Sequence, residues 1–243
     1  MHEPTAGPPA ASEKPSLIED CIDIWFTPSA VFARRRDGGA LGPFVVSSVL
    51  LIALFYAAMG PLQGVFDAEL MRAVADARVQ NPNLTGDQLA AMQSVIEKSI
   101  RFGGLIFLPI VLLLLGVFVW LAAKILGGRL SFGGGLMVAS FAYLPKGLEL
   151  LLVTVQGLVM DTSTWTGRYQ FSWGAARFME PTASQGLYNL LGRVDVFTVW
   201  VTILLAIGLV HAAKVENAKA YAGAATIWVL GATPALLQLV TGK

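Results

Sequence analysis

The chain has 243 residues, of which 55% are hydrophobic and only 14% are charged, and its formal net charge is +1. Ordinary soluble domains carry about 25% charged residues, so this composition excludes a soluble fold as well as a disordered or collagen-like chain. The near-neutral charge excludes a nucleic-acid binder, and the single cysteine, Cys21, excludes a disulfide scaffold. With a mean hydropathy of +0.65, the chain is predicted to be an all-α, polytopic helical membrane protein.

Residues 1–42 are predicted to form a cytoplasmic tail with one short amphipathic helix. A helical projection places on one face Leu17, Ile18, Cys21, Ile22 and Trp25. On the opposite face it places Glu19, Asp20 and Asp23. Such a helix lies in the membrane interface or packs on the helix bundle with its apolar face. Cys21 is then expected to be a small packing residue.

Five apolar stretches follow, and each is long enough for a spanning helix of roughly 20 residues. Within a membrane domain of residues 43–242, we place the spans at about 43–66, 102–124, 132–160, 195–214 and 220–241. Pro145 lies in the middle of the third stretch, and proline kinks or breaks a helix. That stretch is therefore either one kinked span or two half-helices. Asp195 opens the fourth stretch and is predicted to cap its helix by accepting from free backbone N–H groups.

Two longer loops connect spans on the side opposite the N-terminus. The first, residues 67–101, predicts an external helical hairpin, because Asn81-Pro82-Asn83 indicates a turn and Thr85-Gly86-Asp87-Gln88 has capping-box spacing. The second, residues 161–194, is rich in aromatic residues, which are Trp165, Tyr169, Phe171, Trp173 and Phe178. Aromatic residues near span ends are typical of an interfacial belt.

Basic residues cluster near alternate ends of the spans. The cluster precedes the first span and continues in two short turns, as Arg34-Arg35-Arg36, Lys124, Arg129, His211, Lys214 and Lys219. Positive charge in short loops marks the cytoplasmic side. This pattern predicts a cytoplasmic N-terminus and a C-terminus on the other side.

Groups that carry out chemistry are nearly absent from the sequence. There is no set of His, Cys or carboxylate residues at metal-binding spacing, no phosphate-binding loop and no nucleophile elbow. The three glycines at residues 133–135 are expected to permit close helix packing. We therefore expect no catalytic residues, no cofactor and no metal.

The exception is a pair of charged residues, Lys146 and Glu149, near the middle of the third stretch. Their i, i+3 spacing lets them meet on one helix face, and Pro145 just before them frees a backbone carbonyl. Charges at this depth cost several kcal/mol and usually face the bundle interior. We interpret them as a self-neutralised structural pair, with a transport or proton site as the alternative.

Several segments resemble the Yip-domain family, the Rab-GTPase-interacting integral membrane proteins and their bacterial relatives. The resemblance covers about residues 17–240 and is carried by five segments: Phe26–Phe32, Gly127–Gly135, Ala142–Pro145 with Tyr143, Asp195–Trp200, and Leu204–Leu209 with Gly208. It implies a polytopic membrane protein without known catalysis. Eukaryotic members act in ER–Golgi vesicle traffic, partly through a longer cytosolic N-terminal region. Here that region has only about 42 residues, which puts Rab binding in question and favours the bacterial branch.

The resulting hypothesis is a non-catalytic membrane organiser or partner-binding protein of a bacterial inner membrane. The alternative is a small transporter or permease component that uses Lys146 and Glu149. The expected partners are the lipid bilayer and a protein partner or a second copy of the chain, with no nucleic acid.

Overall fold

The computed structural model describes residues 16–161, 169–180 and 184–241. All the regular elements in these ranges are helices, and two residues, Gly174 and Asp195, form an isolated antiparallel bridge. The helices are α1 (Leu17–Asp23), α2 (Pro28–Arg35), α3 (Leu41–Met59), α4 (Gln63–Gln80), α5 (Gly86–Ile125), α6 (Phe132–Ala142), α7 (Leu144–Val159), η2 (Ala175–Phe178), α8 (Gln185–Leu191), α9 (Val196–His211) and α10 (Asn217–Thr241).

Four helical segments of the described chain are long and apolar enough to cross a membrane. They are Leu41–Met59, Gly86–Ile125, Phe132–Val159 and Asn217–Thr241, and a shorter apolar helix, Val196–His211, accompanies them. The third segment joins α6 and α7, so the break near Pro145 lies within one kinked span. The predicted all-α, polytopic architecture is confirmed, with four of the five predicted spans matched by these segments and the remaining one, 195–214, by the shorter helix.

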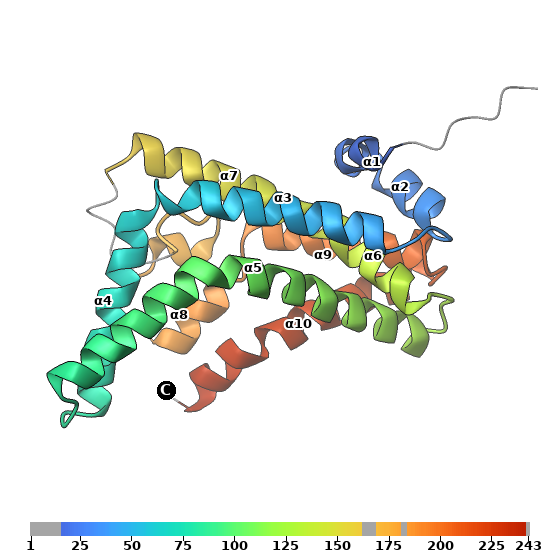
Figure 1. The fold of residues 1–243 in the computed structure, drawn as a ribbon. Helices are drawn as coiled ribbons and strands as arrows, with labels where there is room; N and C mark the ends of the chain where they lie inside the picture. Colours follow the sequence, from blue (N-terminus) through green and yellow to red (C-terminus); the bar gives the residue numbers. More distant parts are fainter. Residues whose placement is uncertain (1–15, 162–168, 181–183, 242–243) are drawn as a thin grey trace, which may run out of the picture.

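The spanning helices form an elongated bundle whose two ends differ. At one end, α1 and α2 lie near the start of α6 and the end of α9 (Figure 1). The turn after α5 is tied there to the turn after α9, because the Arg129 N–H donates to the Ala213 carbonyl at 2.7 Å. At the other end lie α4, α8 and the C-terminal end of α10 (Figure 1).

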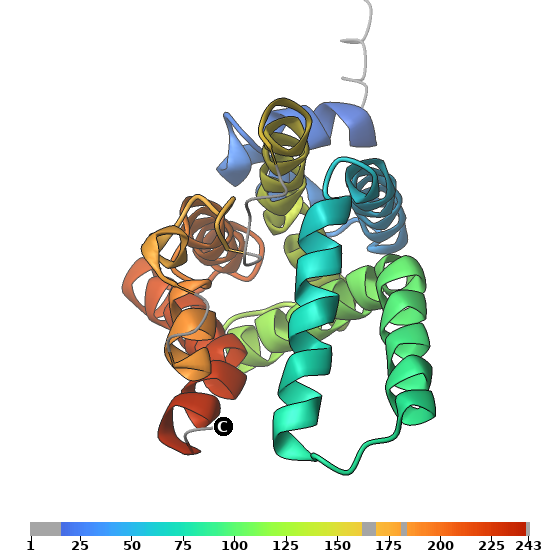
Figure 2. The same ribbon diagram turned by 90° about the vertical axis from the view of Figure 1, so that its left-hand side faces the viewer.

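The helical hairpin forms as predicted. Helix α4 and the first half of α5 are its two arms, and their turn projects away from the bundle (Figure 2). Thr85 caps α5, and its side chain and that of Gln88 make the reciprocal bonds of a capping box. The first span ends at Met59, before the end of its apolar run, because Pro61 cannot continue a helix.

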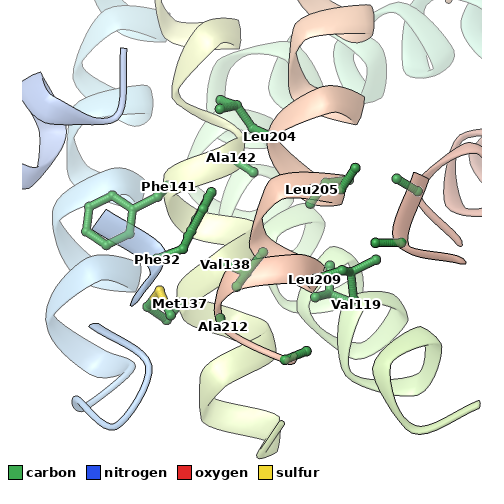
Figure 3. Close-up of a cluster of buried hydrophobic side chains, with 14 of the residues drawn as sticks. Phe32, Val119, Met137, Val138, Phe141, Ala142, Leu204, Leu205, Leu209 and Ala212 are labelled. Carbon is green, nitrogen blue, oxygen red and sulfur yellow. The ribbon is translucent and has the colours of Figure 1, made fainter. Parts of the chain in front are cut away.

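The core lies where α2, α5, α6 and α9 meet. Its buried residues include Phe32, Val119, Met137, Val138, Phe141, Leu204, Leu205 and Leu209 (Figure 3). Two glycine contacts allow this packing. A Cβ on Gly135 would lie 2.6 Å from the Gly116 carbonyl oxygen, and one on Gly208 would lie 2.3 Å from Val138 Cγ1. The glycines at the start of α6 and Gly208 of α9 therefore set the helix spacing.

Helix α1 packs on the bundle through part of the predicted apolar face, because Leu17, Cys21 and Trp25 contact the core. The rest of that face and one acidic residue differ from the prediction. Ile18 and Ile22 are exposed, whereas Asp20, assigned to the polar face, is fully buried. Asp20 forms ion pairs with Arg34 and Arg35 of α2. Asp20 alone of the acidic residues of α1 is therefore buried, because the arginines neutralise its charge, while Glu19 stays exposed. The exposed isoleucines suit contact with the membrane interface.

Candidate functional site

The candidate site begins at the junction of α6 and α7. Helix α6 ends at Ala142 and α7 starts at Leu144, so Tyr143 alone separates them. Pro145 occupies the first turn of α7. Backbone N–H groups in the first turn of a helix have no partner within the helix, so the missing N–H of proline costs no hydrogen bond there. The Lys146 N–H donates to the Tyr143 carbonyl at 3.0 Å. This junction fixes the position of Lys146 within the bundle.

Lys146 lies between two carboxylates. Its Nζ is 2.6 Å from Glu149 Oε2 on the same helix, as the i, i+3 spacing predicts. It is also 3.2 Å from both carboxylate oxygens of Asp195, at the start of α9. The side chains of Lys146 and Glu149 are 23% and 19% exposed, and that of Asp195 is 2% exposed. The three residues form one cluster, the Lys146 cluster, which joins α7 to α9.

Asp195 is the N-cap of α9, as predicted. Its Oδ1 accepts from the backbone N–H groups of Phe197 and Thr198, both at 2.9 Å. The Thr198 hydroxyl donates to its other oxygen. The carboxylate thus accepts from the helix terminus, a hydroxyl and an ammonium group, which is the arrangement that makes burial of a charge tolerable.

Two cavities lie on either side of the Tyr143 and Lys146 side chains. The first, of about 530 Å³, is bordered by α5, α9 and α10 and also by Arg193. The second, of about 490 Å³, is bordered by α3, α4, α5 and α7 and contains Glu149 in its wall. Both volumes fall within the 300–1,000 Å³ typical of small-molecule sites.

The structure places the other predicted motif residues close to this cluster or in the core. Trp200 of α9 makes an edge-to-face contact with Trp25, with ring centroids 5.0 Å apart. Gly208 allows the close approach of α6 and α9 described above. Tyr143 lines both cavities. Trp200 and Gly208 are therefore packing residues, and Tyr143 belongs to the Lys146 cluster's surroundings.

Part of the second aromatic loop enters the bundle and does not form only an interfacial belt. Phe171 packs with Leu62, Val65 and Val153 and lines the second cavity. Tyr169 packs edge-to-face on Tyr188 and lines the first cavity. Trp173 and Phe178 are exposed, while Trp165 lies outside the described residues.

Sequence reasoning missed one contact and one residue of this site. It treated Lys146 and Glu149 as a pair and Asp195 only as a cap, although Asp195 completes the cluster from 49 positions away. It also passed over Arg193, which lines the first cavity. One sequence feature could have drawn attention to Arg193 and Asp195: charged residues are rare close to apolar spans, and these two lie just before one.

The arrangement is suited to holding helices together electrostatically. Removing one partner of a buried ion pair lowers the folding stability by several kcal/mol, because the other charge is left uncompensated. No group of three or more His, Cys, Asp or Glu side chains that could hold a metal ion is found among the described residues.

The comparisons with known proteins agree with this architecture. The sequence matches the Yip1 domain family over residues 22–237. Membrane protein YknW of Bacillus subtilis (strain 168) is 26% identical over 200 residues, which is 82% of this chain and 79% of that protein. No solved structure matches the chain. Because the family match spans most of its residues, the chain belongs to the Yip1 domain family of membrane proteins.

Proposed function

We propose that the protein is a non-catalytic membrane organiser that acts by binding a protein partner or a second copy of itself. One observation carries this proposal: the intramembrane charges are engaged with one another. Lys146 is held by Glu149 and Asp195, and Asp195 is at the same time bound to the start of α9. A group so engaged stabilises a helix junction and is poorly placed to bind and release an ion or substrate.

We further propose that the protein lies in a bacterial inner membrane with its N-terminus in the cytoplasm. The relative in Bacillus subtilis supports a bacterial setting. The basic turns near Arg129 and Lys214 lie at the same end of the bundle as α1 and α2, which supports that orientation. Reporter fusions before residue 16 and after residue 241 should indicate opposite compartments, whereas two cytoplasmic ends would refute the orientation.

The decisive experiment neutralises the charged pair and reads two properties. In Lys146→Met/Glu149→Leu the formal charge of the cluster stays at −1, because one cation and one anion are removed together. We expect this variant to fold in detergent, because Asp195 keeps its hydrogen bonds from Phe197 and Thr198. It should also correct whatever defect deletion of the gene causes. The single variant Lys146→Met should fold worse, because it leaves two carboxylates without their cation.

A transport role predicts a different result. A transporter needs the charged groups themselves, so the double variant would fold and yet fail to complement the deletion. That outcome would overturn the organiser proposal. Asp76→Ala, on the exposed surface of α4, serves as the control for unspecific effects of removing a charge.

A further inference from the structure

The first cavity has an unusual distribution of charge and apolar surface. Among the described residues that line it, two are cationic, Lys146 and Arg193, and none is acidic. Lys146 is paired with the carboxylates of Glu149 and Asp195, whereas Arg193 is not. The rest of the lining is mostly apolar and comes largely from α5, α9 and α10, including Leu114, Leu205 and Ile227.

Arg193 is the unsatisfied group in this cavity. In the described part of the chain its guanidinium has no ion-pair partner, and its Nε is buried without a hydrogen-bond acceptor. The backbone around it is fixed, since its carbonyl accepts from Trp228 Nε1 at 3.2 Å. An unpaired buried donor on a charged group is costly, and a guanidinium fits a phosphate or carboxylate with two parallel bonds.

The bare backbone of α10 makes room for this side chain. A Cβ on Gly231 would lie 2.6 Å from Arg193 Nη2, so the guanidinium lies against the helix at that glycine. Gly231 is 14 residues beyond the start of α10, which corresponds to about 21 Å of helix. Lys146 is likewise 14 residues beyond the start of α6. Both cations thus lie at similar depth, toward the far side of a hydrocarbon layer of about 30 Å when that layer is measured from the end of the bundle that holds α1 and α2.

The cavity is open toward the surface that lipid would cover. Leu114 and Phe118 line it and are also 53% and 37% exposed. Their neighbours Ile110, Leu113 and Leu121 on α5 are exposed as well. A ligand entering between these side chains would come from the hydrocarbon region, so it must itself carry an apolar chain.

We propose that this cavity binds an anionic amphiphile, with its acidic head group on the Arg193 guanidinium and its alkyl chain along the apolar wall. The positive charge of the lining favours an anionic head group, and the apolar part of the lining favours an alkyl chain. Two sources supply this chemistry, an anionic phospholipid of the bilayer and a free fatty acid. The proposal does not depend on the organiser role, since a transporter could carry the same site.

Native mass spectrometry of the full-length protein tests the proposal. The protein is delipidated in mild detergent and titrated separately with phosphatidylglycerol, phosphatidylcholine and palmitate. We expect at least one anionic ligand to bind about tenfold more tightly than phosphatidylcholine, a preference of ~1.4 kcal/mol. Comparison of phosphatidylglycerol with palmitate identifies the source.

Two variants locate the binding. Arg193→Gln should abolish the preference for the anionic ligand. The control Arg129→Gln, at an exposed arginine in the turn after α5 that does not line the cavity, should retain it. Leu114→Trp narrows the apolar wall from a lipid-facing position and should weaken the anionic ligand about tenfold with Arg193 in place.

Each result has a definite reading. Equal binding of all three ligands to the wild-type protein would overturn the proposal, as would a full anionic preference in Arg193→Gln. If Arg193→Gln does not fold, Leu114→Trp decides the question, since unchanged affinity there would place the ligand elsewhere. If neither variant folds, the head-group preference of the wild-type protein alone upholds or overturns the anionic site.

Discussion

Asp195 combines two structural roles that substitution can separate. Its Oδ1 accepts two backbone N–H groups at the start of α9, and its charge faces Lys146 at 3.2 Å. Asparagine keeps an oxygen at the Oδ1 position but loses the charge. Alanine loses both. The series wild type, Asp195→Asn and Asp195→Ala therefore divides the contribution of the residue into a charge term and a capping term.

The geometry sets the expected sizes of the two terms. Removing the charge costs about 1.5–3 kcal/mol, the range for a hydrogen bond to a charged group. The cost stays below that of an orphaned buried ion, because Lys146 keeps Glu149 at 2.6 Å. Losing the cap adds about 0.5–2 kcal/mol. We expect stability to fall from wild type to asparagine and again to alanine.

Thermal unfolding in detergent, followed by circular dichroism, measures the series. For a protein of this size, each kcal/mol corresponds to roughly 2–4 °C in Tm. Asp76→Ala, an exposed aspartate on α4, should leave Tm unchanged. If asparagine is as harmful as alanine, capping contributes nothing. If asparagine equals wild type, the contact with Lys146 contributes nothing and the cluster is not a structural element.

Three further predictions concern other parts of the fold. Gly208→Ala should cost about 1–3 kcal/mol by overpacking, because its Cβ would meet Val138, and Val138→Ala should recover much of the loss in the same unfolding assay. Thr85→Ala should cost about 0.5–2 kcal/mol, visible as faster hydrogen exchange confined to the start of α5; a uniform increase would contradict a local cap. Burial, and then the charge of Asp20, raises the pKa of the Cys21 thiol, so maleimide should label this cysteine slowly at neutral pH. Asp20→Asn should speed labelling, and an unchanged rate would contradict the docking of α1 through its ion pairs.

The spans could be predicted because lipid imposes a simple rule on sequence. A spanning helix must satisfy its own backbone and present apolar side chains over its length, so the apolar runs mark the helices directly. Sequence patterns also predicted hydrogen bonds and ion pairs correctly where the two partners lie only a few residues apart. The caps at Thr85 and Asp195 and the contact between Lys146 and Glu149 are of this kind.

Contacts between distant segments could not be predicted from the same patterns. Nothing in the periodicity brings Asp195 to Lys146, since the approach depends on how α7 and α9 pack. The burial of Asp20 and the exposure of Ile18 and Ile22 in α1 were misjudged for a related reason. In a membrane protein apolar side chains suit both the interior and the outside, so the burial of Asp20 was decided by Arg34 and Arg35, residues of the next helix.

The short length of α9 has a consequence for the surrounding bilayer. Its 16 residues extend about 24 Å, less than the ~30 Å of a typical hydrocarbon layer. Its lipid-accessible stripe of Val196, Val199 and Ile203 cannot match that thickness, whereas α10 with 25 residues exceeds it. A bilayer that α9 crosses would therefore thin beside it, at a cost of fractions of a kcal/mol per Å. Such hydrophobic mismatch on the α9 side of the protein favours its placement in thinner membranes. It also favours contacts in which the α9 sides of two neighbouring copies face each other.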